Sequence, residues 1–231
     1  IEELDNVLSD ISNNQKIRVL VLTGEGKAFS AGGDLDWMKR MANLSYEENH
    51  KDAMKLAVML KKLDRLPFPT IAAVNGAAFG GGVGLVSACD IAIGNEYAKF
   101  SLSEVRLGLI PATISPYVVR AVGSRNARYL FMTSNLIFPE EAHHLGLLTH
   151  HTLNNNFDNL IEKNIENILK GGPEAIKASK DLVFYVEDKK IDETVMTETA
   201  KRIADARATN EGKEGTNAFL NKRKPGWQKN D

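Results

Sequence analysis

The stretch VNGAAFGGGVGLVSACD, residues 74–90, decides how the rest of this chain is interpreted. It places three consecutive glycines, Gly80, Gly81 and Gly82, between an apolar run at residues 70–74 and a run of small residues typical of a tightly packed helix. Glycine loses the most conformational freedom on folding, so three in a row need a local reason. Either the backbone packs closely against another segment, or its N–H groups are left bare for a ligand. Because the first N–H groups of a helix lack partners and carry its positive dipole end, the second alternative predicts a site for an anion or a developing oxyanion.

The composition is that of an ordinary globular protein and argues against several classes. With 231 residues, 43% of them apolar and 26% charged, the chain can form one sizeable core with a smaller appendage. Its 29 basic and 30 acidic residues give a net charge of −1, so we expect no nucleic-acid partner and no membrane partner. The single cysteine, Cys89, indicates a reducing compartment, the cytoplasm or, in a eukaryote, the mitochondrial matrix. No apolar run approaches the ~20 residues that span a bilayer.

Apolar periodicity predicts an alternation of helices and strands in the first half of the chain. We expect helices at residues 1–11 and 46–63, strands at 17–22, 70–74 and 91–93, and a loop at 23–38. This order is typical of the α/β class with a parallel sheet. Because the chain opens inside an expected helix, whether residues precede Ile1 is open.

The second half of the chain has a different character. A short strand, a turn and a helix start are expected between residues 99 and 116, followed by helices at residues 116–130, 139–145, 157–169, 173–186 and 191–208. A boundary near Asn154 would separate a core of residues 1–153 from a helical region of residues 154–231.

The sequence lacks the residue spacing of several common nucleotide-binding and metal-binding motifs. No segment supplies the phosphate-binding Gly-x-x-x-x-Gly-Lys-Ser/Thr pattern, and the glycines near Gly82 stop short of Gly-x-Gly-x-x-Gly. Neighbouring histidines, at residues 143–144 and 150–151, point to different helix faces, so we expect solvated surface helices there and no metal site. Cys89 is expected to be a packing residue rather than a nucleophile.

Two glycine-rich loops remain, each expected to follow a parallel strand. Loops that follow adjacent parallel strands lie at the same edge of a sheet. The N–H groups of Gly32 and Gly33 could then converge with those of residues 80–82 on one oxygen, which would form an oxyanion hole. Two unrelated tight turns are the alternative.

Glu104 follows in a segment that we expect near the same edge. Its neighbours Leu102, Val105 and Leu107 are apolar, and desolvation of a carboxyl group raises its pKa toward the range of a general acid or base. The alternative is a surface glutamate at the start of a helix, where it would complement the helix dipole. The sequence leaves both open.

At these residues the chain resembles the crotonase (enoyl-CoA hydratase/isomerase) family. The segments that carry the resemblance are residues 26–35, 72–82, 88–91, 100–111 and 219–225, so it covers nearly the whole chain in order. The segment SLSEVRLGLIPATISPYVVRAVG, residues 101–123, most resembles the methylglutaconyl-CoA hydratase-like subgroup. The resemblance implies a fold of repeated ββα units with a C-terminal helical trimerisation region, assembled as a homotrimer or a dimer of trimers.

The resemblance also implies roles for individual residues. Gly33 and Gly81 would donate the two oxyanion N–H groups to the thioester carbonyl of an acyl-CoA substrate, and Ala31 would lie near its adenine. Phe219 and Lys222 would reach the acyl or coenzyme A end across a subunit boundary; an ordinary helix end with a basic tail is the alternative. Coenzyme A is then part of the substrate, and no separate cofactor or metal is expected.

The chain departs from the family pattern at one carboxylate. Gly84 stands where a typical hydratase has its first glutamate, which leaves Glu104 alone and, we expect, leaves room for a branched acyl group. The predicted function is reversible hydration of a 2-enoyl-CoA, with 3-methylglutaconyl-CoA of leucine degradation as a candidate. A Δ3,Δ2-enoyl-CoA isomerase, or a non-catalytic or RNA-binding protein of the same fold, is the alternative.

Overall fold

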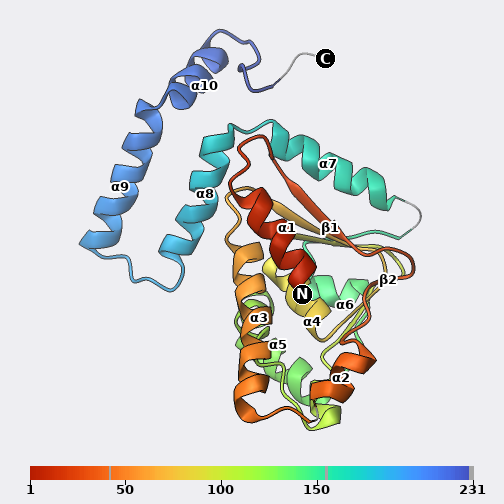
Figure 1. Cartoon of the computed structure of the whole chain (residues 1–231). Helices are drawn as coiled ribbons and strands as arrows, with labels where there is room; N and C mark the ends of the chain where they lie inside the picture. The colour runs from red at the N-terminus through yellow and green to blue at the C-terminus, as the bar shows by residue number, and fades with distance from the viewer. Residues whose placement is uncertain (42, 154–155, 229–231) are drawn as a thin grey trace. The chain divides into compact units, whose positions relative to one another are not determined.

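The computed structural model describes residues 1–41, 43–153 and 156–228 (Figure 1). The chain divides into two compact units. Unit 1 comprises Ile1–Leu66 and Thr70–Glu162, and unit 2 comprises Pro67–Pro69 and Lys163–Asp231. The boundary expected at Asn154 lies outside the described residues.

Unit 1 contains a parallel sheet in the order β1-β3-β5-β7, as the alternating pattern predicted. Its strands are β1 (Leu20–Thr23), β3 (Thr70–Val74), β5 (Ile91–Gly94) and β7 (His150–His151). Every residue of β3 is buried, as expected for a central strand covered on both faces. The prediction of a surface helix was wrong for His150 and His151, because both belong to the edge strand β7 beside β5.

A second, smaller parallel sheet in the order β2-β4-β6 lies in the same unit. It consists of β2 (Ala28–Ser30), β4 (Ala77–Phe79) and β6 (Lys99–Ser101). The sequence analysis placed residues 28–30 in the loop expected at 23–38 and assigned no element to residues 77–79, because three residues are too few to show an alternating pattern. Each of these strands directly follows one strand of the larger sheet, which produces the ββα order that the family resemblance implied.

Six α-helices lie entirely within unit 1, counted over the described residues. They are α1 (Glu2–Ser12), α2 (Leu35–Met41), α3 (Tyr46–Asp64), α4 (Gly81–Ala88), α5 (Ser115–Thr133) and α6 (Pro139–His144). Helix α4 packs against both α3 and α5, so its small residues are buried on several sides. Ser45 and Glu48 form a capping box that begins α3.

Unit 2 contains helices and no strand in its described residues. Helix α7 (Phe157–Leu169) leads into it, and α8 (Pro173–Val186), α9 (Glu193–Ala208) and α10 (Asn210–Leu220) follow. The sequence analysis gave no bounds for α10 and named only a helix end at Phe219 and Lys222, as one of two alternatives. After this helix, Arg223 and the Gly226 N–H both bind the Glu214 carboxylate, which lowers the pKa of Glu214 to about 2.

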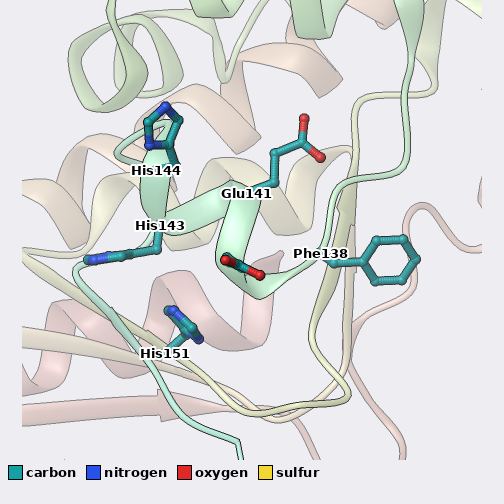
Figure 2. A pocket seen from close by; sticks show the side chains of 6 residues that line it. Phe138, Glu141, His143, His144 and His151 are labelled. Atoms are coloured by element: carbon teal, nitrogen blue, oxygen red, sulfur yellow. The ribbon is translucent and has the colours of Figure 1, made fainter.

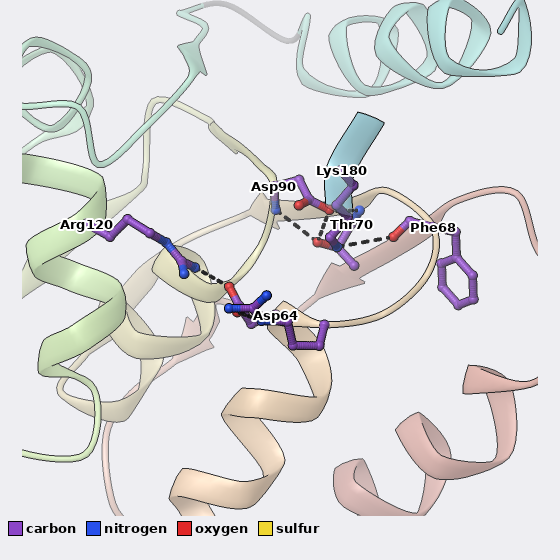
Figure 3. Close-up of polar contacts among 7 residues, drawn as sticks. Asp64, Phe68, Thr70, Asp90, Arg120 and Lys180 are labelled. Carbon is purple, nitrogen blue, oxygen red and sulfur yellow. Dashed lines mark hydrogen bonds and ion pairs between the residues drawn. The ribbon is translucent and has the colours of Figure 1, made fainter. Parts of the chain in front are cut away.

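A buried carboxylate joins two helices of unit 1. Asp64, at the end of α3, is 4% exposed and pairs with Arg120 of α5 and with Arg65 at 3.1 Å (Figure 3). A second polar link joins the starts of β3 and β5, where the Thr70 N–H and hydroxyl donate to Asp90 Oδ2 at 2.8 and 2.9 Å. The first contact therefore links α3 to α5, and the second links β3 to β5.

We expect Asp64→Asn to lower the free energy of unfolding by about 3 kcal/mol, because it removes the buried carboxylate charge that pairs with both Arg120 and Arg65. Urea denaturation measures the change. Asp36→Asn is the matched control, since the Asp36–Lys39 pair is exposed and worth at most about 1 kcal/mol. Equal losses in the two variants would contradict the structural role of Asp64.

Candidate active site

Three loops that carry the predicted chemistry follow the three strands of the small sheet. Gly32 and Gly33 come after β2, the glycine triplet after β4, and Glu104 after β6. These strands are parallel neighbours, so their following loops lie at one edge. The sequence analysis also expected the glycine loops to lie at one edge of a sheet. It assigned them to the strands of the larger sheet, whereas they follow the strands of the smaller one.

Gly80 allows Glu104 to approach the beginning of helix α4. Its backbone has φ 52° and ψ −116°, a conformation that side chains rarely adopt. A Cβ atom at this position would lie 3.1 Å from Glu104 Oε1. The Gly80 N–H donates to the Ser101 carbonyl at 3.0 Å, which ties the loop to the end of β6. The Glu104 carboxylate therefore lies beside the N-terminus of α4.

The other two glycines of the triplet serve different purposes. A Cβ at Gly82 would lie 2.8 Å from Ser30 Cβ, so this glycine lets the helix pack against the end of β2. A Cβ at Gly81 would meet nothing within 4 Å. As the first residue of α4, Gly81 has an N–H that the helix itself does not use. Both alternatives raised by the triplet therefore apply, close packing at Gly82 and an available N–H at Gly81.

Gly33 lies in an exposed loop against an anchored tryptophan. A Cβ at Gly33 would be 3.0 Å from Trp37 Cζ3, and the Trp37 indole N–H donates to Asp52 of α3 at 3.2 Å. Asp34 accepts the Trp37 backbone N–H at 2.8 Å and so begins helix α2. The preceding Ala31 is exposed. The loop that contains Gly33 thus rests on a side chain fixed by α3.

Glu104 is the first residue of a short 3₁₀ helix, Glu104–Leu107, and is partly buried. Burial raises the pKa of its carboxyl group, and a hydrogen bond from its own backbone N–H opposes the rise. Its Oε2 atom is buried and has no hydrogen-bond partner among the described residues. Of the two alternatives for Glu104, the structure supports a partly desolvated carboxyl group rather than a solvated surface glutamate.

The room expected beside Gly84 is filled by protein. Ile114, which is 2% exposed, has its Cβ 2.8 Å from the position of a Gly84 Cβ, and its Cγ2 lies closer still. Gly84 is therefore a close-packing glycine, and the prediction that it leaves space for a branched acyl group was wrong. The sequence could not show this, because Ile114 is distant along the chain and reaches α4 only through the packing of α5.

The two remaining predicted site residues belong to unit 2. Phe219, near the end of α10, is 83% exposed, and Lys222 follows the helix with φ 50° and an exposed side chain. The Lys222 N–H donates to the Phe219 carbonyl at 3.1 Å, a bond of the helix end. Their predicted contact with substrate remains a prediction.

A hollow of about 830 Å³ lies elsewhere in unit 1 (Figure 2). It is lined by Phe138, Glu140, Glu141, His143, His144 and His151. The rings of His143 and His151 are 5.4 Å apart, and His143 Nδ1 is 3.0 Å from the Leu148 carbonyl oxygen. The lining includes none of the predicted site residues.

Across residues 1–41, 43–153 and 156–228, no group of three or more His, Cys, Asp or Glu side chains is arranged to hold a metal ion. Within the same ranges, no helix is long and apolar enough to cross a membrane.

Comparison with known proteins gives a consistent result. The family model for enoyl-CoA hydratase/isomerase matches residues 1–230. The short-chain-enoyl-CoA hydratase of Clostridium acetobutylicum is 32% identical over 226 residues, which cover 97% of this chain and 85% of that protein. The crystal structure of an enoyl-CoA hydratase from Shewanella pealeana is 43% identical and superposes with a TM-score of 0.94 over 98% of this chain and 84% of that one.

We expect Glu104→Gln to raise stability at neutral pH. Because burial raises the native pKa above 4.5, the unfolded chain releases this proton first as pH rises, so wild-type stability falls between pH 4.5 and the native pKa. The substituted amide has no proton to lose, so the variant should melt at a higher temperature than wild type at pH 8 and at a similar one at pH 4. Thermal unfolding followed by circular dichroism at both pH values measures this, and an equal effect at both would contradict a buried, titrating Glu104.

Proposed function

The chain belongs to the enoyl-CoA hydratase/isomerase family, and we propose that it is an enzyme that adds water reversibly to a 2-enoyl-CoA thioester. The proposal rests on one observation: the partly buried Glu104 lies beside the N-terminus of α4. A Cβ atom added at Gly80 would be 3.1 Å from Glu104 Oε1. A base of raised pKa beside an unused helix N–H suits chemistry next to a carbonyl.

In this proposal the Gly33 and Gly81 N–H groups bind the thioester carbonyl oxygen. As charge moves onto that oxygen, the two donors and the positive end of the α4 dipole stabilise the enolate. The open space at Gly81 and the anchored loop of Gly33 support these assignments. Two such donors polarise the substrate double bond and make C3 electrophilic.

Glu104 then carries out both proton transfers. Its carboxylate takes a proton from water while the water oxygen bonds to C3, and its carboxyl group returns that proton to C2 as the enolate collapses. The carboxylate is regenerated, so one water is consumed and no other reactant is required. The raised pKa favours both steps, because it brings the group closer to the operating pH.

The finer assignments rest on the family resemblance. A branched substrate such as 3-methylglutaconyl-CoA now depends on residues 101–123 alone, since Ile114 fills the space beside Gly84. Contacts of Ala31, Phe219 and Lys222 with coenzyme A, a homotrimer or dimer of trimers, and a cytoplasmic or mitochondrial-matrix location belong to the same proposal.

An isomerase is the second candidate. With Glu104 alone, a proton could be moved between two carbons without addition of water. A relative from Dictyostelium discoideum, 29% identical over 236 residues, is named as a Δ(3,5)-Δ(2,4)-dienoyl-CoA isomerase. A non-catalytic or RNA-binding role has less support, since the net charge is −1.

We expect the protein to remove the conjugated absorbance of crotonyl-CoA or 3-methylglutaconyl-CoA, and Glu104→Gln to reduce kcat on the order of a hundredfold or more. Glu140→Gln, an exposed glutamate away from the three loops, is the control and should retain activity. Mass spectrometry of the product separates the candidates, because hydration adds one water and isomerisation leaves the mass unchanged. Failure to turn over any 2-enoyl-CoA would refute the hydratase assignment.

We also expect Trp37→Ala to lower kcat about tenfold to a hundredfold, because the loop of Gly33 loses its support. Trp37→Phe keeps a ring at the contact and should recover most of the rate. Steady-state kinetics measures both variants. Wild-type kcat in Trp37→Ala would contradict an oxyanion role for this loop.

A further inference from the structure

Ile114 and Gly84 share a single volume between helices α4 and α5. Ile114 is the residue that precedes α5, and its side chain is essentially buried at 2% exposure. Its Cβ is 2.8 Å from where a Gly84 Cβ would be, nearer than real Cβ contacts occur. A side chain at position 84 therefore requires Ile114 to move or to be smaller.

Position 84 lies one helical turn beyond the residue that faces Glu104. The Gly84 N–H donates to the Gly80 carbonyl at 3.3 Å, so the first turn of α4 is closed. One turn advances the backbone by about 6 Å, and side chains of a helix tilt toward its N-terminus. A Glu or Asp at position 84 would thus extend back toward Gly80, where Glu104 Oε1 already lies.

We propose that Ile114 is a specificity-determining residue: it excludes a second acidic side chain from position 84 and so restricts the site to the single carboxylate of Glu104. The inference rests on the proposed function for its chemical consequence. With one proton carrier, the site suits reactions in which the proton taken is the proton returned. Reactions in which two carboxylates hold the water between them are excluded by the Ile114 side chain.

Helix preference supports a specific reason for glycine at position 84. Glycine in the interior of a helix is less stable than alanine, and Gly84 lies in the interior of α4. The backbone conformation does not require glycine here, because Gly84 does not have a positive φ. The close approach of Ile114 is the contact that accounts for it.

A stability comparison tests the shared volume without any substrate. We expect Gly84→Ala to lower the melting temperature clearly, whereas Gly81→Ala, the same change in the same helix at an open position, should have a small effect. Gly84→Glu should be the most destabilised variant. Ile114→Gly removes the side chain that fills the space, and glycine is tolerated at the N-cap of a helix. The double variant Gly84→Glu/Ile114→Gly should therefore have a higher melting temperature than Gly84→Glu alone.

A titration tests the second half of the proposal. We would follow the carboxyl ¹³C signal of Glu104, assigned by its absence in Glu104→Gln, in Ile114→Gly and in the double variant. A carboxylate added at position 84 should raise the titration midpoint of Glu104 above that of Ile114→Gly and give two coupled steps.

The outcomes are distinct. The proposal is overturned if Gly84→Ala is no less stable than Gly81→Ala, if Ile114→Gly does not rescue Gly84→Glu, or if the Glu104 midpoint is the same with and without Glu at position 84. If Gly84→Glu does not fold, the comparison of Gly84→Ala with Gly81→Ala and the behaviour of the double variant still test the proposal. An inactive wild type with the expected rescue and midpoint shift would refute the proposed hydratase function and leave the role of Ile114 in place.

Discussion

The side-chain amide of Asn75 holds together the turns on which this site depends. Its Nδ2 donates to the carbonyls of Gly24 and Gly26 at 2.8 and 3.0 Å, and its Oδ1 accepts the Gly24 N–H at 3.3 Å. The Asn75 carbonyl in turn accepts the Asn95 amide at 3.0 Å. These bonds connect the turns β1–β2, β3–β4 and β5–β6, so the short strands emerge side by side. Without that alignment, strands of three residues would have little to fix their register.

The alignment places three different requirements on helix α4, and a different glycine meets each one. Gly80 adopts a positive φ and leaves space for Glu104, Gly82 admits Ser30 of β2, and Gly84 admits Ile114. Glycine weakens a helix, so α4 depends on its burial between α3 and α5 rather than on its own propensity. Close packing and a first N–H that the helix itself does not use are therefore combined in one short helix.

Desolvation connects this packing to reactivity. Partial burial in unit 1 raises the pKa of Glu104, and its Oε2 has no hydrogen-bond partner among the described residues. A partly desolvated carboxylate costs stability at neutral pH. Ile114 fits this arrangement, because a second acidic group beside Glu104 would be repelled and more expensive still.

The sequence by itself determined the parallel α/β class, the strand at 70–74, the helix from residue 46 and the glycines and glutamate of the candidate site, because these depend on local periodicity and chain order. It missed β2, α2 and β4 and gave no bounds for α10, because short or glycine-containing segments carry little periodic signal. Only the tertiary structure decided that Gly84 meets Ile114 and that Glu104 lies beside Gly80. Both are contacts between segments distant in the chain, and the volume that a side chain leaves or fills depends on how its neighbours pack.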